Sequence, residues 1–266
     1  KPEQLTSNGT CMRYAPEWAP DGKRLAFSDK DGKLFILTLD DKNLTEIADE
    51  KRGQVRDYAW SADGGHLAFS LSNDNNTRSL YIWSAADGQT RRATNDLFSQ
   101  AGPVWDPDGN YLFFASSREY APLIGSNEFN FALNRNQGLF ALALRKDVKN
   151  PFPPESDEVT LAPESPAPGA TPPSPAPGPA PASVAAGFSP ASQEAKSAAP
   201  SKEEPKKKDY IKIDFDGIAD RVTRVPVDAD NFFGLAAIKG HLLFARGGGF
   251  YYGRESDVQT SLRIYS

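Results

Sequence analysis

The sequence contains little of what a metal centre, a disulfide framework or a transmembrane helix requires. Its 266 residues include one cysteine, Cys11, and two histidines, His66 and His241. One cysteine cannot form a disulfide within the chain, and two isolated histidines lack the ligand spacing of a zinc site. No run of 18 apolar residues occurs, so no helical membrane span is predicted.

An excess of positive charge is also missing. The formal net charge is -5, so a nucleic-acid partner is not expected. The one dense basic run, Lys206–Lys208, comes shortly after Glu203 and Glu204. We interpret it as the solvated end of a linker.

A repeat is what the sequence does contain. The pattern Trp-x-x-Asp-Gly-x-x-Leu-x-Phe occurs three times, beginning at Trp18, Trp60 and Trp105. The tryptophans lie 42 and 45 residues apart, which is the length of a four-stranded β-propeller blade. A β-sandwich is the alternative all-β fold, but it does not explain why one unit recurs at nearly constant spacing, whereas in a propeller each unit packs on its neighbours.

Each repeat predicts strands joined by tight turns. The Asp-Gly pairs at 21–22, 63–64 and 108–109 are typical hairpin turns, and the Leu-x-Phe that follows alternates as a half-buried strand does. Third strands are predicted at 34–39, 80–83 and 139–144, and fourth strands at 45–48 and 89–94. The predicted fold is therefore an all-β propeller fragment of about three and a half to four four-stranded blades.

The two ends of the sequence extend this pattern. Residues 2–6 are interpreted as the last strand of a preceding blade. Residues 232–238, 241–245 and 262–265 are predicted to be three strands of a degenerate fourth blade, with Lys239-Gly240 at its turn. We expect the sequence to be part of a longer chain.

Two segments, 118–136 and 151–209, interrupt the blade repeat. We divide the chain into propeller blades (1–150), a disordered Pro/Ala-rich insert (151–209) and a propeller continuation (210–266). The insert is predicted to be a solvent-exposed loop in the third blade, beside its outer strand; a Pro-rich docking site is the alternative. A shorter excursion, 118–136, separates the second and third strands of that blade and carries Tyr120, Phe129 and Phe131. It is either a packed loop or a binding loop.

Catalytic chemistry is not visible. There is no Gly-x-Ser-x-Gly elbow, and Gly247–Gly249 lacks the Lys-Ser/Thr of a phosphate-binding loop. The Asp-Gly pairs lack the acidic spacing of a Ca²⁺ loop. His66 and His241 each follow a turn and precede a Leu-rich strand, so we predict a turn-flanking role for both. We assign no catalytic, cofactor-binding or metal-binding residue, and we expect no cofactor.

The repeats resemble those shared by tricorn-type proteases and the TolB translocation protein. The segment 211–227 narrows the choice, because it resembles the Ile-Asp-x-Asp-Gly-Ile-x-x-Arg-Val-x-x-x-Pro-Val signature of tricorn-type proteases. The matching residues are Ile213, Asp214, Asp216, Gly217, Ile218, Arg221, Val222, Pro226 and Val227. Of these, Asp216 and Arg221 are expected to form an ion pair that fixes a crossing between strands.

The resemblance implies a large serine peptidase with two propellers followed by PDZ-like and catalytic domains. Those domains lie outside these 266 residues, so no catalytic residue is carried over. The leading hypothesis is a non-catalytic propeller that gates or channels peptides or unfolded polypeptide in the cytoplasm. Its expected partners are the rest of the parent chain and, as a further hypothesis, other copies of itself in a homo-oligomer. The alternatives are a TolB-like protein-binding scaffold of the cell envelope, located in the periplasm, and the propeller cap of a prolyl-oligopeptidase-like enzyme. An open run of blades is expected to aggregate or to be marginally stable when expressed alone.

Overall fold

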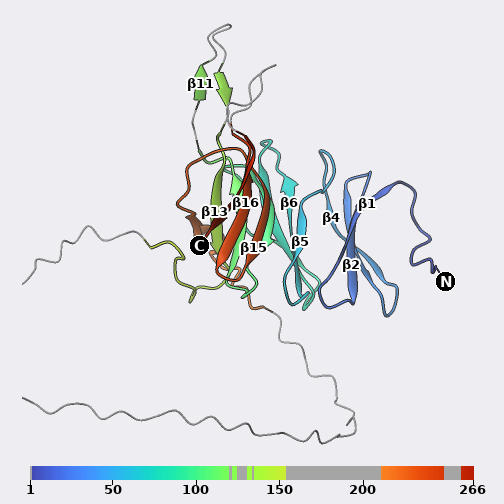
Figure 1. The fold of residues 1–266 in the computed structure, drawn as a ribbon. Helices are drawn as coiled ribbons and strands as arrows, with labels where there is room; N and C mark the ends of the chain where they lie inside the picture. Colours follow the sequence, from blue (N-terminus) through green and yellow to red (C-terminus); the bar gives the residue numbers. More distant parts are fainter. Residues whose placement is uncertain (1, 120–121, 125–130, 134, 154–210, 249–258) are drawn as a thin grey trace, which may run out of the picture. The chain divides into compact units, whose positions relative to one another are not determined.

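The computed structural model describes residues 2–119, 122–124, 131–133, 135–153, 211–248 and 259–266 (Figure 1). These residues form antiparallel sheets whose strands follow one another in chain order. The first blade contains β1 (Arg13–Trp18), β2 (Arg24–Asp29), β3 (Lys33–Thr38) and β4 (Leu44–Asp49). The second contains β5 (Tyr58–Trp60), β6 (His66–Ser72), β7 (Arg78–Ser84) and β8 (Thr90–Arg92).

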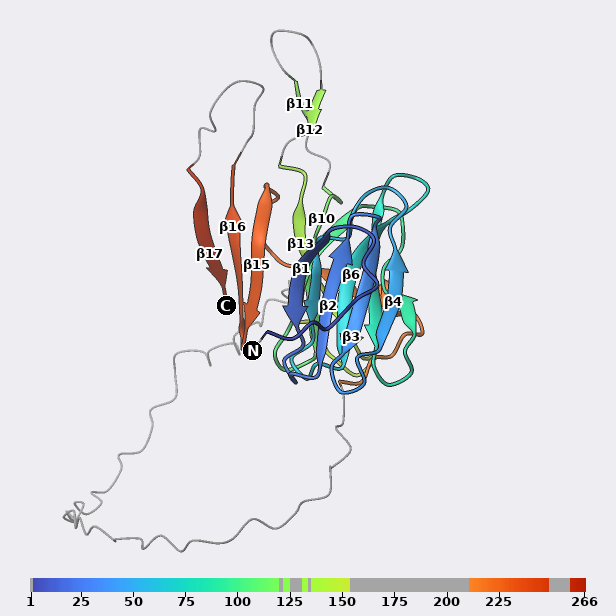
Figure 2. The ribbon, with the colours of Figure 1, turned by 90° about the vertical axis from the view of Figure 1, so that its right-hand side faces the viewer.

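The third blade is assembled from two separated parts of the chain. It contains β9 (Gln100–Trp105), β10 (Tyr111–Ser116), β13 (Gly138–Ala143) and β14 (Val222–Arg224). A separate hairpin, β11 (Pro122–Ile124) and β12 (Phe131–Leu133), leaves the blade between β10 and β13 and lies beyond their ends (Figure 2). The 3-10 helix η1 (Ile218–Asp220) directly precedes β14.

The fourth blade has the three strands that the sequence predicts. They are β15 (Phe232–Ile238), β16 (His241–Arg246) and β17 (Ser261–Tyr265). The Lys239-Gly240 turn joins the first two, and Gly240 adopts φ 74° there. The all-β propeller fragment is therefore confirmed.

The insert lies outside the described residues from 154 to 210. Strand β14 nevertheless pairs with β13, from Phe140↔Arg224 to Leu142↔Val222. The chain thus leaves the third blade after its third strand, β13, and returns to form the fourth strand of the same blade, β14. The domain boundaries at 150/151 and 209/210 stay a prediction.

The prediction of a strand at residues 2–6 is wrong. The structure assigns no strand to residues 2–9. The segment instead lies beside the β3–β4 turn, where Glu3 forms an ion pair with Lys42 at 2.5 Å. A fourth strand of a blade needs the third strand of the same blade as its pairing partner, and residues 2–9 pair with none.

The prediction of half-buried second strands is also incomplete, because the inner blades are covered on both faces. In β6, Leu67 and Phe69 pack into the cluster shared with the first blade, while Ala68 packs into the cluster shared with the third. All three side chains are fully buried. Stacked blades bury both faces of a strand, so the alternation of large and small residues here separates two neighbouring blades rather than core and solvent.

The Asp-Gly turns form as predicted. Gly22, Gly64 and Gly109 adopt φ values of 68°, 70° and 70°, a left-handed conformation that favours glycine. In the first two blades the aspartate of the pair accepts a hydrogen bond from the backbone N–H two residues later. In the third blade Asp106 takes this role, accepting from the N–H groups of Asp108 and Asn110.

The repeated tryptophan joins each blade to the one before it. Trp60 donates its Nε1–H to the carbonyl of Glu17 at 3.1 Å, and Trp105 donates to the carbonyl of Ala59 at 2.9 Å. In both cases the acceptor immediately precedes the tryptophan of the previous repeat. Because each indole bonds to the residue before the previous tryptophan, this hydrogen bond requires a nearly constant spacing between repeats. The donor and acceptor residues are 43 and 46 residues apart.

Candidate functional site

The blades present two ends with different chemistry. The Asp-Gly turns at 21–22, 63–64 and 108–109 lie at one end of their antiparallel blades. The loops joining second and third strands (30–32 and 73–77) and the connections between blades (50–57, 93–99 and 225–231) lie at the other, which we call the loop end. Binding residues concentrate on loops that a rigid scaffold positions, so the loop end is the candidate functional surface.

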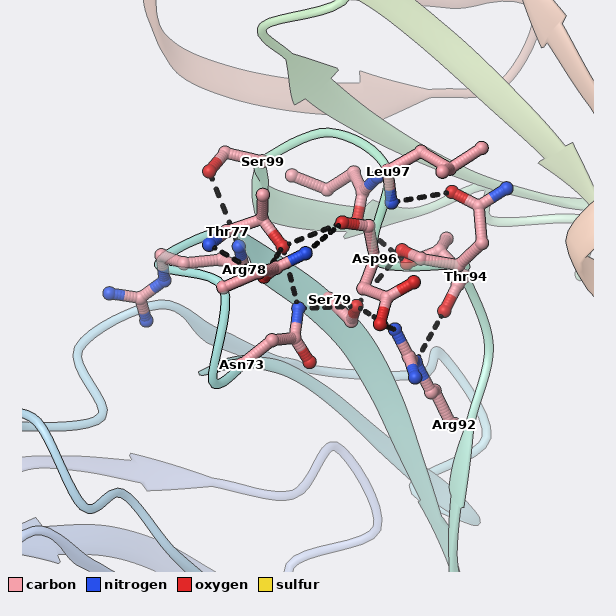
Figure 3. A network of polar contacts seen from close by, with 12 residues as sticks. Asn73, Thr77, Arg78, Ser79, Arg92, Thr94, Asp96, Leu97 and Ser99 are labelled. Atoms are coloured by element: carbon pink, nitrogen blue, oxygen red, sulfur yellow. Dashed lines mark hydrogen bonds and ion pairs between the residues drawn. The ribbon is translucent and has the colours of Figure 1, made fainter.

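A polar network holds the loop end of the second blade (Figure 3). The hydroxyl of Ser79 accepts hydrogen bonds from Asn73 Nδ2 at 2.9 Å and Arg92 Nη2 at 2.8 Å, and it donates to the carbonyl of Asn95. Thr77 donates to the carbonyl of Asp96 at 2.8 Å. The loop 73–77 and the connection 93–99 are thereby tied together.

Acidic side chains bridge consecutive blades at this end. Asp57, which precedes β5, accepts from Ser70 at 2.7 Å and from the N–H of Gly102 in the third blade at 3.0 Å. Glu50 is buried after the first blade and accepts from the N–H of Ser72 in the second. These carboxylates are committed to interblade contacts, which is a structural use of their charge.

Before the fourth blade, Asp230 has the same role. Its side chain is fully buried and contacts the guanidinium of Arg246, with Arg135 at 3.9 Å. Its backbone forms an isolated bridge with Gln137. Sequence reasoning missed all three acidic bridges, because no local pattern distinguishes Glu50, Asp57 or Asp230 from an exposed acid.

The segment 211–227 covers the junctions between blades. Ile211, Ile213, Phe215, Ile218 and Val222 pack into the cluster between the second and third blades. The backbone N–H of Ile211 donates to Asp63 in the turn of the second blade. Val225 and Val227 pack into the cluster between the third and fourth blades. The segment therefore straps three blades together.

The predicted ion pair between Asp216 and Arg221 is wrong. Arg221 donates instead to four backbone carbonyls, those of Ala143, Leu144, Asp214 and Asp216. The carboxylate of Asp216 lies 2.6 Å from Lys146, and the hydrogen bond from that ammonium lowers the pKa of Asp216. Arg221 does fix the crossing, but its planar fork of donors suits several carbonyls better than one carboxylate.

Both histidines begin the second strand of their blade, directly after a turn. His66 is buried with its ring centroid 6.0 Å from that of Trp105, and burial lowers the pKa of His66. His241 lies at the start of β16, where its Nδ1 is 2.9 Å from the hydroxyl of Ser266.

One group of possible metal ligands occurs among the described residues, and the sequence did not indicate it. Ligand atoms of Cys11, Asp29 and Asp31 lie within 4.8 Å of one another. Asp29 Oδ1 already accepts from the N–H groups of Asp31 and Lys33, so this carboxylate closes the β2–β3 turn. In the part of the chain that the structure describes, no helix has the length and hydropathy to cross a membrane.

The sequence is similar to proteins named as tricorn proteases or tricorn-like proteases. The chain is 24% identical over 231 residues to tricorn protease homolog 1 of Streptomyces coelicolor, covering 86% of this chain and 18% of that protein. It is 26% identical over 142 residues to a putative tricorn-like protease C-terminal subunit of Sulfurisphaera tokodaii, covering 53% and 16%. The chain thus spans less than a fifth of the length of these relatives.

The fold comparison agrees. The crystal structure of the tricorn protease superposes with a TM-score of 0.62 at 13% identity, covering 88% of this chain and 19% of that one. The family model described as the tricorn protease second beta propeller domain matches residues 1–266. The chain therefore belongs to the family of the tricorn protease second β-propeller domain.

Proposed function

We propose that this chain is the non-catalytic β-propeller portion of a tricorn-like serine peptidase, where it gates or channels peptides to a catalytic domain outside these residues. The observation that carries the proposal is the family match over residues 1–266. Two relatives, named as a tricorn protease homolog and a tricorn protease, are 24% and 23% identical to it over 231 and 144 residues. The parent protein would be a hydrolase, and this chain would shape access to its active site.

The use of polar side chains supports a non-catalytic role. The acids at the loop end are held by backbone N–H groups, serines or arginines of the adjoining blade. His66 is buried against Trp105 and has a lowered pKa, so it stays neutral and packed. Such groups rigidify a scaffold. They leave the connecting loops as the surface that peptides or unfolded polypeptide would meet.

Other partners follow from the same proposal. The chain would pack against the rest of its parent polypeptide and form a homo-oligomer. It would act in the cytoplasm, where peptide fragments are the substrates, and it would need no cofactor. Fractionation of cells and size-exclusion chromatography of the complete protein test these statements.

The first test is the chemistry of the complete protein. We expect a fluorophosphonate probe, which reacts with activated serines, to label a serine outside residues 1–266 and to block hydrolysis of a fluorogenic peptide. Labelling of a serine within these residues would contradict the non-catalytic role. An absence of both labelling and hydrolysis would refute the peptidase assignment.

The second test concerns access. A peptide carrying a photoreactive side chain should cross-link to the loop end, and an excess of the unmodified peptide should suppress the cross-link. Cross-links confined to the Asp-Gly turns, or insensitive to competition, would contradict a role of the loop end in guiding peptides. The control is polyethylene glycol carrying the same photoreactive group, because this polymer has no peptide bonds.

A further inference from the structure

Arg118 is held between two aromatic rings at the loop end of the third blade. It lies two residues beyond β10, with its guanidinium carbon 4.8 Å from the ring centroid of Phe140 and 5.6 Å from that of Phe98. Phe140 is buried in β13, whereas Phe98 is 39% exposed on the connection between the second and third blades. The rings fix the plane of the guanidinium and leave its edge as the face for hydrogen bonding.

The donors of Arg118 are not used up. Its Nε donates to the hydroxyl of Ser116 at 3.3 Å, but Nη2 is buried and has no hydrogen-bond partner. Among the described residues, no carboxylate pairs with Arg118, and the adjacent Glu119 is paired with Arg224 at 3.0 Å. Burial without a compensating anion lowers the pKa of Arg118.

Three other arginines of this end are paired with acids. Arg78, Arg92 and Arg246 each have a carboxylate within 4.0 Å, from Asp57, Asp96 and Asp230 respectively. Buried polar groups are nearly always satisfied, and each exception in a native protein calls for an explanation. The unsatisfied nitrogen of Arg118 is one such exception.

A second unsatisfied donor belongs to Gln100, which pairs with Ser116 across the sheet. Gln100 is fully buried in β9 and is the cross-strand partner of Ser116. Its Oε1 accepts from the hydroxyl of Thr94 at 2.8 Å, which directs the amide nitrogen away from Thr94, and that nitrogen has no partner. The two residues with an unpaired nitrogen are thus both neighbours of Ser116, Arg118 by a hydrogen bond and Gln100 by strand pairing.

We propose that Arg118 anchors a binding site for a carboxylate carried on an apolar group, with Phe98 at the mouth of the site. A planar carboxylate matches the free edge of a guanidinium, and charge-assisted bonds of this kind are the strong ones. The exposed Phe98 and Leu97, which is 71% exposed, offer an apolar surface for the carbon part of the ligand. The single cation suits one negative charge better than a doubly charged phosphate.

This site is independent of the proposed peptidase role, because it rests on unsatisfied donors and not on the family. The probe is N-acetylphenylalanine, titrated by calorimetry into the complete protein, with its uncharged amide and inorganic phosphate as comparisons. We expect saturable binding of the acid, at least about tenfold weaker binding of the amide, and weaker binding of phosphate. Amide exchange of residues 97–99 should slow when the acid is bound.

The matched variants are Arg118→Met and Arg56→Met. Arg56 is an exposed arginine on the preceding connection between blades and is hydrogen-bonded to Gln54. Arg118→Met should weaken binding of the acid at least about tenfold and abolish the slowing at 97–99, while Arg56→Met should leave both unchanged. Arg118→Lys, which keeps the charge but not the fork, should lie between them and guards against misfolding of the methionine variant.

Three results would overturn the proposal. They are a lack of saturable binding of the acid, equal affinities for the acid and its amide, and unchanged binding in Arg118→Met. Binding that depends on Arg118 but favours phosphate over the acid would reject the carboxylate and replace it by a different anion.

Discussion

Replacing Arg221 by methionine should selectively loosen the strap formed by residues 211–227. Methionine keeps the apolar part of the side chain but removes the donors to four carbonyls, of which those of Ala143 and Leu144 are partly buried. The carbonyl of Leu144 retains the N–H of Asp214 at 2.9 Å. The carbonyls of Asp214 and Asp216 are exposed, so water replaces much of what they lose.

These losses set the expected size of the effect. One partly buried carbonyl loses its arginine donor without a replacement and three others exchange theirs for weaker contacts, so the free energy of local opening should fall by about 3 kcal/mol. Hydrogen–deuterium exchange of the complete protein measures it. Amides of β14 and of residues 211–216 should exchange roughly a hundredfold faster, since 1.4 kcal/mol is a factor of ten.

Arg224→Met is the control for this prediction. Arg224 is the last residue of β14, three residues after Arg221, but its ion pair with Glu119 is half exposed. A surface pair of this kind contributes about 0–1 kcal/mol, so exchange should change by less than roughly fivefold. Equal effects of the two substitutions, or a change below about tenfold for Arg221→Met, would refute the reasoning that Arg221 fixes the crossing.

Four further substitutions test the blade contacts by the same exchange measurement. Trp105→Phe removes the hydrogen bond to the Ala59 carbonyl and should destabilise the second and third blades by about 1–2 kcal/mol; no change would contradict the role of the repeated indole. Gly22→Ala should cost about 1 kcal/mol for its positive φ, and Gly64→Ala more, because a Cβ there would lie 3.0 Å from an aspartate of the first blade; equal costs would exclude that contact. Burial holds the pKa of His66 below its usual value, so the unfolded state takes up a proton first as the pH falls below about 6.5, and stability should decrease there in the parent protein but less in His66→Phe; parallel pH profiles would refute this.

Much of the blade architecture is readable from local sequence. A glycine at positive φ and a preceding aspartate determine the hairpin turns at 21–22, 63–64 and 108–109, and alternating large residues determine the strands beside them. The period then implies stacked blades. Residues 2–6 misled the same reasoning, because a short apolar-polar run predicts a strand but not a partner for it.

The candidate site was less readable. Nothing near Arg118 in the sequence distinguishes it from Arg78 or Arg92, and its unpaired nitrogen exists only because Phe98, Phe140 and Ser116 surround it from three different strands and connections. The same holds for the acids that bridge blades. Whether a charged side chain is paired depends on neighbours distant in the chain, and no local pattern encodes them.

The sequence by itself determined the blade repeat, the turns and the place where the third blade is interrupted, because these depend on contacts within one turn or one strand. Only the tertiary structure decided that the tryptophans link successive blades, that Arg221 binds carbonyls rather than Asp216, and that Arg118 keeps a free donor. The physical reason is that hydrogen bonds and burial of side chains depend on partners distant in the chain: about 20 residues separate Arg118 from its two rings, 46 separate Trp105 from Ala59, and 78 separate Arg221 from Ala143.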